Sequence, residues 1–500
     1  MRKFLLASAA TLGTAGLTGL AFAQAPAGAP TQGQVAYPAA SPVSYVNDNN
    51  NYQAPALPGA LANPTPGTIV VHFNGKVTTE MQGVWTSADN RLLTIPASGT
   101  TPAVTGSIKL QPIALNTFAR LYAGADGMAT NGLRYGAAIE VRENFSGQIT
   151  STASSGASGY SSLETLFVRR AFTYVAGEQW GIARFGQADG LISIFDNGVT
   201  TFQFLPSGNL NGGDLQNMPT AVTPPFWFVA QAGNEYTNSK AVYLSPQIAG
   251  FDFGIQYAPN TSNGFGLSGT TNGLTGSLTT NCNVANTGCP TLSSSPIVGD
   301  GARVKNQIAA GIRYQGKFGD VGLLAYGVWE GSDHVTYTGS TAPAVLGTAT
   351  LPGSKFNGKF SGLNIGSMGI AVTYAGFTVG GNGIIGRANG QLALAPDGGV
   401  GTHAYLVGVK YVAGPLTAGI VAERGDDQGD IRMTGLTQRR GRGIDAGVSY
   451  TYAPGATAWV EYLWNDIYQG GVNQITGARG SAANNEIRGQ GFLIGNVVNF

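Results

Sequence analysis

The chain has 500 residues, of which 43% are hydrophobic and only 11% are charged. That charged share is less than half of the roughly 25% typical of soluble proteins. Lys and Arg together number 27 and Asp and Glu number 26, so the charge is nearly balanced. Such a balance provides no basic footprint for nucleic acid. Length alone suggests two or three domains, but an all-β barrel of this size can also form one unit.

The N-terminal sequence MRKFLLASAATLGTAGLTGLAFAQ predicts a secretory signal peptide over residues 1–23. Arg2 and Lys3 form a basic start, a largely apolar stretch follows, and Ala21-Phe22-Ala23 is a small-x-small cleavage signal. A retained membrane helix is the alternative, but Gly and Thr dilute the apolar run. We therefore expect the chain to be exported.

Residues 24–66 are rich in Pro, Ala, Asn and Gln and show no period, which predicts a flexible N-terminal extension. No later segment contains a run of about 20 apolar residues, the length that a membrane-spanning helix needs. An exported chain without such a helix is either soluble or crosses a membrane as a closed barrel. A closed barrel is the other structure that satisfies every backbone N–H and C=O group inside a bilayer.

From about residue 67 onward, apolar residues alternate with polar residues or glycine. The stretches that show this best are LRYGAAIEVREN, GFDFGIQYAP, GIDAGVSYTYAP and ATAWVEYLWND. A period of two residues predicts strands with one apolar and one polar face. In a soluble sandwich the apolar faces would pack against each other, whereas in an outer-membrane barrel they face lipid and the polar faces line the lumen.

The connections between these strands favour the barrel. Short connections at 176–178, 249–250, 315–320, 375–376, 413–415 and 453–456 alternate with long polar ones at 80–113, 190–237, 259–300, 331–361, 388–401, 425–440 and 468–485. The pattern predicts an all-β fold over residues 67–500: a transmembrane antiparallel β-barrel of about 16 strands with short periplasmic turns and long external loops. The strands near 68–79 and 486–500 would close it, and 123–132 would form a longish turn.

Several of these stretches resemble the Gram-negative general porin family. They are FARLYAGADGMATNGLRYGAAIEVREN, RRAFTYVAGEQWGIARFGQ, NSKAVYLSPQIAGFDFGIQYAP and the last strand, which ends in Phe500. The resemblance covers about 67–500 and implies a homotrimer of sixteen-stranded barrels in the cell outer membrane. It implies a water-filled channel through which small hydrophilic solutes and ions diffuse passively. It also implies that Phe500 is the signal recognised by the outer-membrane assembly machinery.

The resemblance further implies that the third external loop, 190–237 in this count, folds into the lumen and constricts it. The acidic candidates are Asp189, Asp196, Asp214 and Glu235. Strand parity gives the basic candidates on the lumen wall as Arg120, Arg134, Arg142, Arg169, Arg184 and Arg313. The same parity points Arg170 outward, toward a subunit interface or the lipid headgroups. Charges that line a pore set its ion preference, and plain solvation of a wet wall is the alternative for each of them.

The remaining motifs give weaker indications of function. Cys282 and Cys289 predict a possible disulfide at a loop tip, and we expect no metal site and no cofactor. His334 lies beside Asp333, but adjacent strand residues point to opposite faces, so we expect no enzyme. The basic run RRGRG at 439–443 is interpreted as a contact with anionic lipid headgroups or solvent rather than with nucleic acid. A sugar- or anion-selective channel, a barrel-borne surface enzyme and an adhesin remain alternative functions.

Overall fold

The computed structural model describes residues 64–87, 90–95, 104–109, 112–144, 165–177, 179–196, 239–260, 305–336, 359–389, 394–429, 437–474, 480 and 482–500. All of these belong to one compact unit that spans residues 40–500. The predicted signal peptide, nearly all of the 24–66 extension and both cysteines lie outside the described residues. Among the described residues, no helix is long and apolar enough to cross a membrane.

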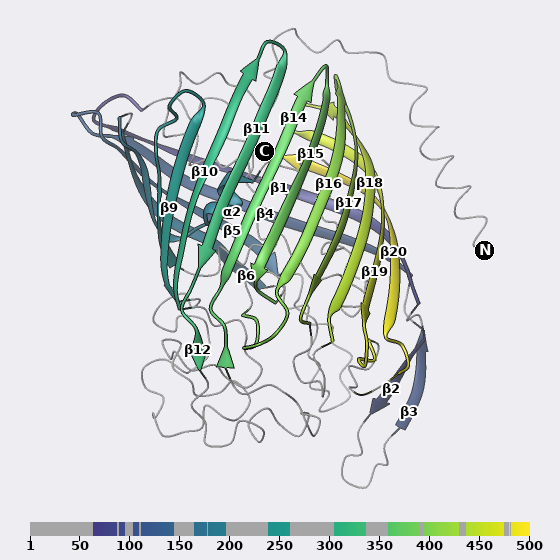
Figure 1. Ribbon diagram of the computed structural model, residues 1–500. Coiled ribbons are helices and arrows are strands. Elements are labelled where there is room, and N and C mark those ends of the chain that lie inside the picture. Colours follow the sequence, from purple (N-terminus) through teal and green to yellow (C-terminus); the bar gives the residue numbers. More distant parts are fainter. Residues whose placement is uncertain are drawn as a thin grey trace, which may run out of the picture. The chain divides into compact units, whose positions relative to one another are not determined.

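Sixteen antiparallel strands form a closed barrel (Figure 1). The barrel strands are β1 (Thr68–Thr86), β4 (Ile113–Met128), β5 (Arg134–Asn144), β6 (Thr165–Gly177), β7 (Gly181–Gln187), β8 (Ser239–Leu244), β9 (Phe251–Asn260), β10 (Lys305–Phe318), β11 (Val321–Gly331), β14 (Asn364–Tyr374), β15 (Phe377–Arg387), β16 (Thr402–Ala413), β17 (Leu416–Asp427), β18 (Arg439–Ala453), β19 (Ala456–Gln469) and β20 (Glu486–Asn499). This confirms the predicted fold class and strand number.

Three small elements are not part of the barrel wall. Two of them are two-stranded hairpins, β2 (Asn90–Ile95) with β3 (Val104–Lys109) and β12 (Val335–Thr336) with β13 (Lys359–Phe360). The third is the one-turn helix α2 (Leu191–Phe195), which follows β7. Each of the three lies in a connection at the end of the barrel where the predicted long loops join the strands.

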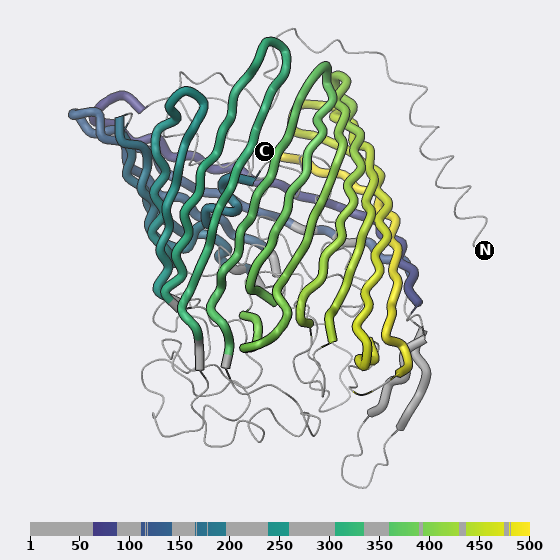
Figure 2. The backbone as a smooth tube through the Cα atoms, viewed as in Figure 1, coloured from purple at the N-terminus to yellow at the C-terminus, as the bar shows by residue number. Residues whose placement is uncertain are grey.

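The first and last strands close the barrel, as predicted. β1 pairs along one edge with β4 and along the other with β20, with Met81 opposite Ile494. At the end of this seam, the backbone N–H groups of Gly75 and Phe500 each donate to the other residue's carbonyl oxygen, at 2.8 and 3.0 Å. Figure 2 shows the purple β1 and the yellow β20 side by side. Closure gives each of the sixteen strands a neighbouring strand on both sides, as a bilayer requires.

Burial follows strand parity around the barrel. On β9, the outward side chains of Phe253, Ile255 and Tyr257 are 49%, 54% and 46% exposed, whereas the inward Gln256 is 3% exposed. The same alternation holds on β16 and β18. Large apolar side chains therefore form the outer surface, and the polar side chains of β9 and β18 lie inside. This is the reverse of a soluble protein and is typical of a barrel surrounded by lipid.

Two of the short turns owe their tightness to an Ala-Gly pair. Ala249 and Gly250 have φ of 51° and 89°, and Ala375 and Gly376 have φ of 48° and 83°. Positive φ at both central residues is the geometry of a type I′ turn, whose twist matches that of the two strands it joins. Glycine adopts this geometry without strain. The sequence expectation of short turns at these two places is confirmed.

The region before residue 130 differs from the prediction. β4 continues to Met128, so residues 123–128 are strand and only 129–133 form the turn, whereas 123–132 had been predicted as turn. The glycines that suggest a turn instead make room inside the sheet: a Cβ at Gly124 would lie 2.2 Å from Cε1 of His72. At the other end of β1, the strand runs on to Thr86, into the segment 80–113 that had been predicted as loop.

Candidate functional site in the lumen

A cluster of arginines surrounds one carboxylate on the inner wall of β5 and β6. Glu140 accepts hydrogen bonds from Arg142 and Arg170, and from Arg169 at 3.0 Å. Arg142 lies two residues along the same strand and therefore on the same face. Glu140, Arg169 and Arg170 are each 2% exposed. Charged hydrogen bonds of this kind are about twice as strong as neutral ones, so the cluster is a rigid part of the wall.

A β-bulge explains how two consecutive arginines point into the lumen. Glu140 pairs with Arg170 and Val141 pairs with Val168, so that Arg169 has no partner of its own in the ladder. An extra residue of this kind bends the strand and redirects the side chains beside it. The prediction that Arg170 points outward is therefore wrong, because strict alternation does not continue through a bulge. Arg169 itself is directed inward, toward Glu140.

Asp189, just after β7, ties the start of the next connection to this cluster. It accepts a hydrogen bond from Arg170, and its Oδ1 lies 3.7 Å from Nη2 of Arg169. Burial by itself would raise the pKa of the Asp189 carboxyl, but Arg170 and Arg169 outweigh burial and hold that pKa below its ordinary value. The carboxylate therefore stays charged at neutral pH. One residue earlier, the carbonyl of Ala188 accepts a hydrogen bond from Nζ of Lys240 at 2.8 Å.

The connection after β7 then enters the lumen as α2. All five residues of α2 are buried, and the helix packs against the inner faces of β9, β10 and β11. The backbone N–H of Leu191 donates to Oε1 of Gln256 on β9 at 2.8 Å. The floor beneath it contains glycine, because a Cβ at Gly254 would lie 2.5 Å from Cδ2 of Leu191. Close packing of α2 on the wall therefore depends on that missing side chain.

Arg313 on β10 is the main anchor of α2. Its guanidinium donates to Oδ1 and Oδ2 of Asp252 at 3.2 and 2.6 Å and to the carbonyl of Ile194 at 3.1 Å. The same group lies over the ring of Phe195, 4.9 Å from its centroid. Directly after α2, Oδ1 of Asp196 accepts a hydrogen bond from Asn382 on β15 at 3.0 Å. The chain between β7 and Asp196 thus passes inside the barrel from one wall to a strand six places away.

The part of the inner wall that α2 covers is apolar. Leu191, Ile192, Ile194 and Phe195 belong to one buried cluster with inward residues of the wall, among them Val242, Leu244, Ala309, Val328, Ile365 and Ile384. On these strands the alternation of apolar and polar residues therefore gives way to apolar residues on both faces. The sequence feature that could have indicated this apolar part of the wall is the run LISIF, which lies in a connection rich in polar residues.

An acidic wall, which the sequence prediction missed, faces the arginine cluster. Glu423 on β17, Asp445 on β18 and Glu461 on β19 point inward and are 5%, 0% and 1% exposed. Gly443 makes room among them: a Cβ there would lie 2.7 Å from Oδ1 of Asn465 and 3.4 Å from Oε1 of Glu423. Around the barrel, eight strands lie between β6 and β17 on one side and six on the other. β17 is therefore nearly opposite β6, whereas only β4, β1 and β20 separate β19 from β5.

The remaining predicted residues divide into two groups. Arg120, Arg134 and Arg184 are buried on the inner face, 4%, 4% and 1% exposed, and Arg120 is the cross-strand partner of Arg142. Their inward direction is as predicted. Asp214 and Glu235, together with Cys282, Cys289 and the rest of the 190–237 segment after Asp196, lie outside the described residues. Within the described residues, no three His, Cys, Asp or Glu side chains are grouped so as to hold a metal ion.

Comparison with known proteins agrees with this architecture. A family model described as Gram-negative porin matches residues 52–466, which is most of the chain. The chain belongs to the Gram-negative porin family. As an outer-membrane porin, it is a channel for the passive diffusion of small hydrophilic solutes and ions. The porin's closed barrel, with its apolar outer surface and charged inner wall, is the structure that this activity requires.

Solved structures resemble the porin at low sequence identity. An anion-selective porin from Comamonas acidovorans is 14% identical, with 87% of this chain and 100% of that one covered and a TM-score of 0.47. A loop-deletion mutant of OmpT, an outer membrane protein of Vibrio cholerae, is 13% identical, with 86% and 99% covered and a TM-score of 0.43. A mutant of Rh. blastica porin is 12% identical, with 86% and 100% covered and a TM-score of 0.41. No curated protein matches the porin's sequence.

Proposed function

We propose that solutes pass between the arginine cluster and the acidic wall, in a lumen that the 190–237 segment narrows. The observation that carries this proposal is the course of residues 189–196, which are bonded to the β6 arginines at one end and to β15 at the other. A segment held across the lumen in this way reduces its cross-section. The loop acids Asp214 and Glu235 belong to the same proposed constriction.

The opposed charges would create a transverse electric field at this level of the pore. Arg142, Arg169, Arg170 and Arg184 lie on β5, β6 and β7, and Glu423, Asp445 and Glu461 lie on β17, β18 and β19, with Glu423 nearly across the lumen from the β6 arginines. Glu140 and Glu423 each lie four residues before the end of their strand, at the end that carries the long connections. Dipolar solutes would orient in such a field, and fixed charges of either sign would bias the passage of ions. A preference for anions or sugars is a narrower form of the same proposal.

Export by the signal peptide at 1–23, assembly as a homotrimer and recognition of Phe500 by the assembly machinery are further parts of the proposal. We also propose that the barrel has no catalytic role. Asp333, the carboxylate beside His334, accepts a hydrogen bond from Nδ2 of Asn306 at 2.7 Å. This contact directs the Asp333 carboxylate toward Asn306 at the start of β10, which supports a channel over a hydrolase.

Single-channel recording of the purified, refolded protein in a planar bilayer tests the channel and its oligomeric state. We expect stepwise conductance in groups of three. If the bilayer shows no current steps after insertion has been verified, the protein is not a channel. If the steps occur singly, the protein is a channel but not a trimer. Replacing His334 with Ala is the matched test for an enzyme, because a hydrolase would lose turnover while conductance stayed the same.

The transverse field predicts opposite effects on ion selectivity from the two walls. The double variant Glu423→Gln/Asp445→Asn should shift the reversal potential in a salt gradient toward anion selectivity, because it removes fixed negative charge from the pore wall. Arg184→Gln should shift it toward cations. The outward arginine Arg387 offers a control, since Arg387→Gln removes a charge without changing the lumen. Equal shifts for inward and outward variants would show that these walls do not line the conducting path.

A further inference from the structure

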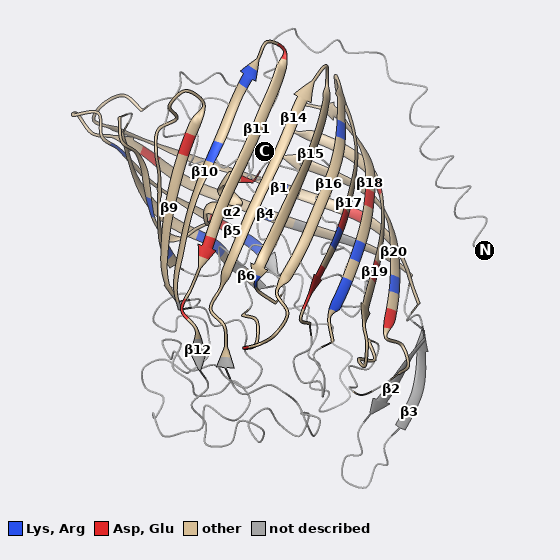
Figure 3. Cartoon of the chain, viewed as in Figure 1, with Lys and Arg blue, Asp and Glu red and all other residues tan. Residues whose placement is uncertain are grey.

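Four arginines form a patch on the outer surface of β17, β18 and β20. The ladder places Arg424 opposite Arg442, Arg442 opposite Asp466, and Asp466 opposite Arg488, so that they lie in one row across four strands. Arg440 lies two residues along β18, on the same face and closer to the long connections. We call Arg424, Arg440, Arg442 and Arg488 the arginine patch. Figure 3 shows basic residues of β18 and β20 near the ends of these strands where the long connections begin.

The arginine patch is directed away from the barrel. The side chains of Arg442 and Arg488 are 58% and 57% exposed, although both contact the carboxylate of Asp466, at 2.7 and 3.7 Å. That carboxylate is only 6% exposed, so it lies beneath the guanidinium groups and leaves their outer sides open. Arg424 and Arg440 are exposed and form no ion pair with another described residue.

Three acids accompany the arginine patch and do not cancel it. Besides Asp466, they are Glu486, which bonds Arg488 at 2.7 Å, and Asp426, which accepts a hydrogen bond from Gln438. Four arginines against three acids leave a net positive charge, and the two arginines without an ion pair stand together on β17 and β18. Arginine binds phosphate oxygens with two parallel N–H groups, which makes it the preferred residue for phosphate recognition.

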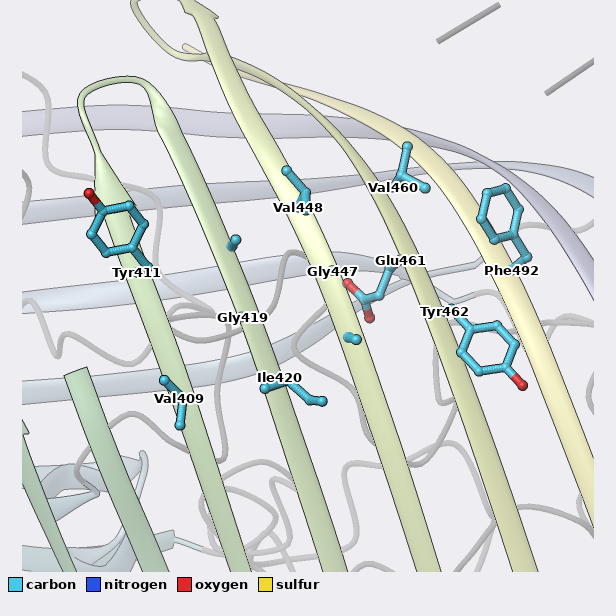
Figure 4. Close-up of a pocket in the computed structure, with 12 residues that line it drawn as sticks. Val409, Tyr411, Gly419, Ile420, Gly447, Val448, Val460, Glu461, Tyr462 and Phe492 are labelled. Carbon is cyan, nitrogen blue, oxygen red and sulfur yellow. The ribbon is translucent and has the colours of Figure 1, made fainter. Parts of the chain in front are cut away.

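An open apolar groove lies on the same outer face, farther from the long connections. Ala418 and Ala446 form its floor, and the larger side chains of Tyr411, Ile420, Val448 and Tyr462 stand around it (Figure 4). Its volume is about 450 Å³. The groove exists because Ala418 and Ala446, on two neighbouring strands, have small side chains. The outward side chains around them are large and protrude, with exposed fractions of 39% to 49%.

The distance between the groove and the arginine patch matches the distance between the acyl chain and the headgroup of a lipid. Ala446 is four residues from Arg442 on β18, which corresponds to about 13 Å along a strand. Between them lies Trp464, whose ring is 5.3 Å from the Arg442 guanidinium carbon. Tryptophan is enriched where a membrane protein passes from the apolar region to the headgroups. The arginines therefore lie at headgroup level and the groove lies within the apolar region.

We propose that the arginine patch and the groove form one binding site for an anionic, phosphorylated lipid of the outer leaflet. The lipid's phosphate lies on the arginines and one acyl chain occupies the groove. A lipid fits this surface better than a second copy of the chain does. The surface has positive charge at headgroup level and an apolar groove below it, which match the phosphate and the acyl chain of one lipid molecule. The site is separate from the lumen, so it does not depend on how the channel conducts.

The test is native mass spectrometry of the full-length protein with dimyristoyl phosphatidylglycerol, and with dimyristoyl phosphatidylcholine as the uncharged-headgroup comparison. We expect the anionic lipid to bind more tightly. The double variant Arg424→Gln/Arg440→Gln should weaken its binding by about fivefold for each arginine removed. These two arginines are chosen because their loss leaves no described carboxylate without its partner. Arg387→Gln, outside the patch, should bind the lipid as the unaltered protein does, and single-channel conductance should be the same in all three.

A second variant tests the groove. Ala446→Phe fills it and should weaken lipid binding, whereas Ala310→Phe, on the outward face of β10, should not. Unchanged binding in the double arginine variant overturns the proposal. Binding of inorganic phosphate to the patch, with no effect of Ala446→Phe on the lipid, also overturns it in favour of a free-anion surface. A change of oligomeric state in Ala446→Phe without a change in lipid binding would identify the groove as a subunit contact instead.

Discussion

The buried carboxylate of Glu140 holds three charged groups of the lumen wall together. Its carboxylate is buried and accepts hydrogen bonds from three arginines, one of which also binds Asp189. Without it, three guanidinium groups would lie close together inside the barrel, and Asp189 contacts two of them. Removing one partner of a buried charge pair is far more costly than the pair's own contribution to stability, because the remaining charge is left uncompensated.

Glu140→Gln should therefore destabilise the folded barrel by about 3–5 kcal/mol. The free energy of unfolding is measured in urea, and unfolding is monitored by the shift in electrophoretic mobility that accompanies it. Glu486→Gln is the matched control, since Glu486 also binds an arginine but lies at the exposed end of β20. Because surface ion pairs are screened by water, that variant should unfold like the unaltered protein. A similar loss in both variants would contradict the role assigned to Glu140.

At the scale of elements, the helix α2 decides how much of the lumen remains open. It is only five residues long and too short to be stable by itself, so its place depends on its contacts with the wall. Arg313 and Gln256 supply polar contacts, and apolar side chains on β8, β11, β14 and β15 contribute to the buried cluster around it. A short segment held mainly by one arginine is a sensitive point for a substitution.

Arg313→Gln should release α2 and increase single-channel conductance. The variant loses two hydrogen bonds to Asp252, one to the Ile194 carbonyl and the contact with the Phe195 ring. Hydrogen bonds to charged groups contribute about 1.5–3 kcal/mol each, which is large for so short an element. The measurement is conductance in a planar bilayer, together with the rate at which larger sugars enter liposomes.

Arg439→Gln provides the control for this experiment. Arg439 is also bonded twice to a buried aspartate on the neighbouring strand, Asp427, at 2.8 and 2.6 Å, but it does not contact α2. The two substitutions therefore break equivalent pairs, and only one of them should widen the pore. Conductance that rises equally in both would mean that general loosening of the barrel, and not release of α2, is responsible.

At the scale of the whole molecule, the barrel exists only when β20 reaches β1. The seam pairs residues about 400 positions apart in sequence and ends at the two hydrogen bonds between Gly75 and Phe500. The Phe500 ring is 52% exposed on the outer surface, with its Cζ 2.8 Å from where a Cβ of Gly75 would lie. The residue therefore both completes the backbone pairing and presents an aromatic ring outside.

Two variants separate these roles of Phe500. Phe500→Ala keeps the backbone hydrogen bonds but removes the ring, and deletion of Phe500 removes both. If the ring is the assembly signal, both variants should reduce the amount of folded protein in the outer membrane severalfold, with normal conductance in the molecules that insert. The amount is measured by immunoblotting of membrane fractions. Normal assembly of Phe500→Ala, with a defect only in the deletion, would assign the effect to the seam.

The sequence by itself determined the fold class, the approximate number of strands and the direction of most lumen charges. These properties follow from local rules: a period of two residues assigns each side chain to a face, and turn residues mark where strands end. Arg120, Arg134, Arg142, Arg184 and Arg313 obeyed that parity and point inward. The strands before residue 130 were less predictable, because glycines there make room for side chains of neighbouring strands instead of forming a turn.

Only the tertiary structure decided what depends on partners distant in sequence. The inward direction of Arg170 comes from a bulge, which exists only in the pairing of β6 with β5. The apolar inner wall is stable because α2 covers it, and Glu423 on β17 lies across the lumen from the β6 arginines because sixteen strands close into a ring. The outer arginine patch likewise joins residues of β17, β18 and β20 into one row. Each of these arrangements is set by register and closure, which alternation along a single strand does not encode.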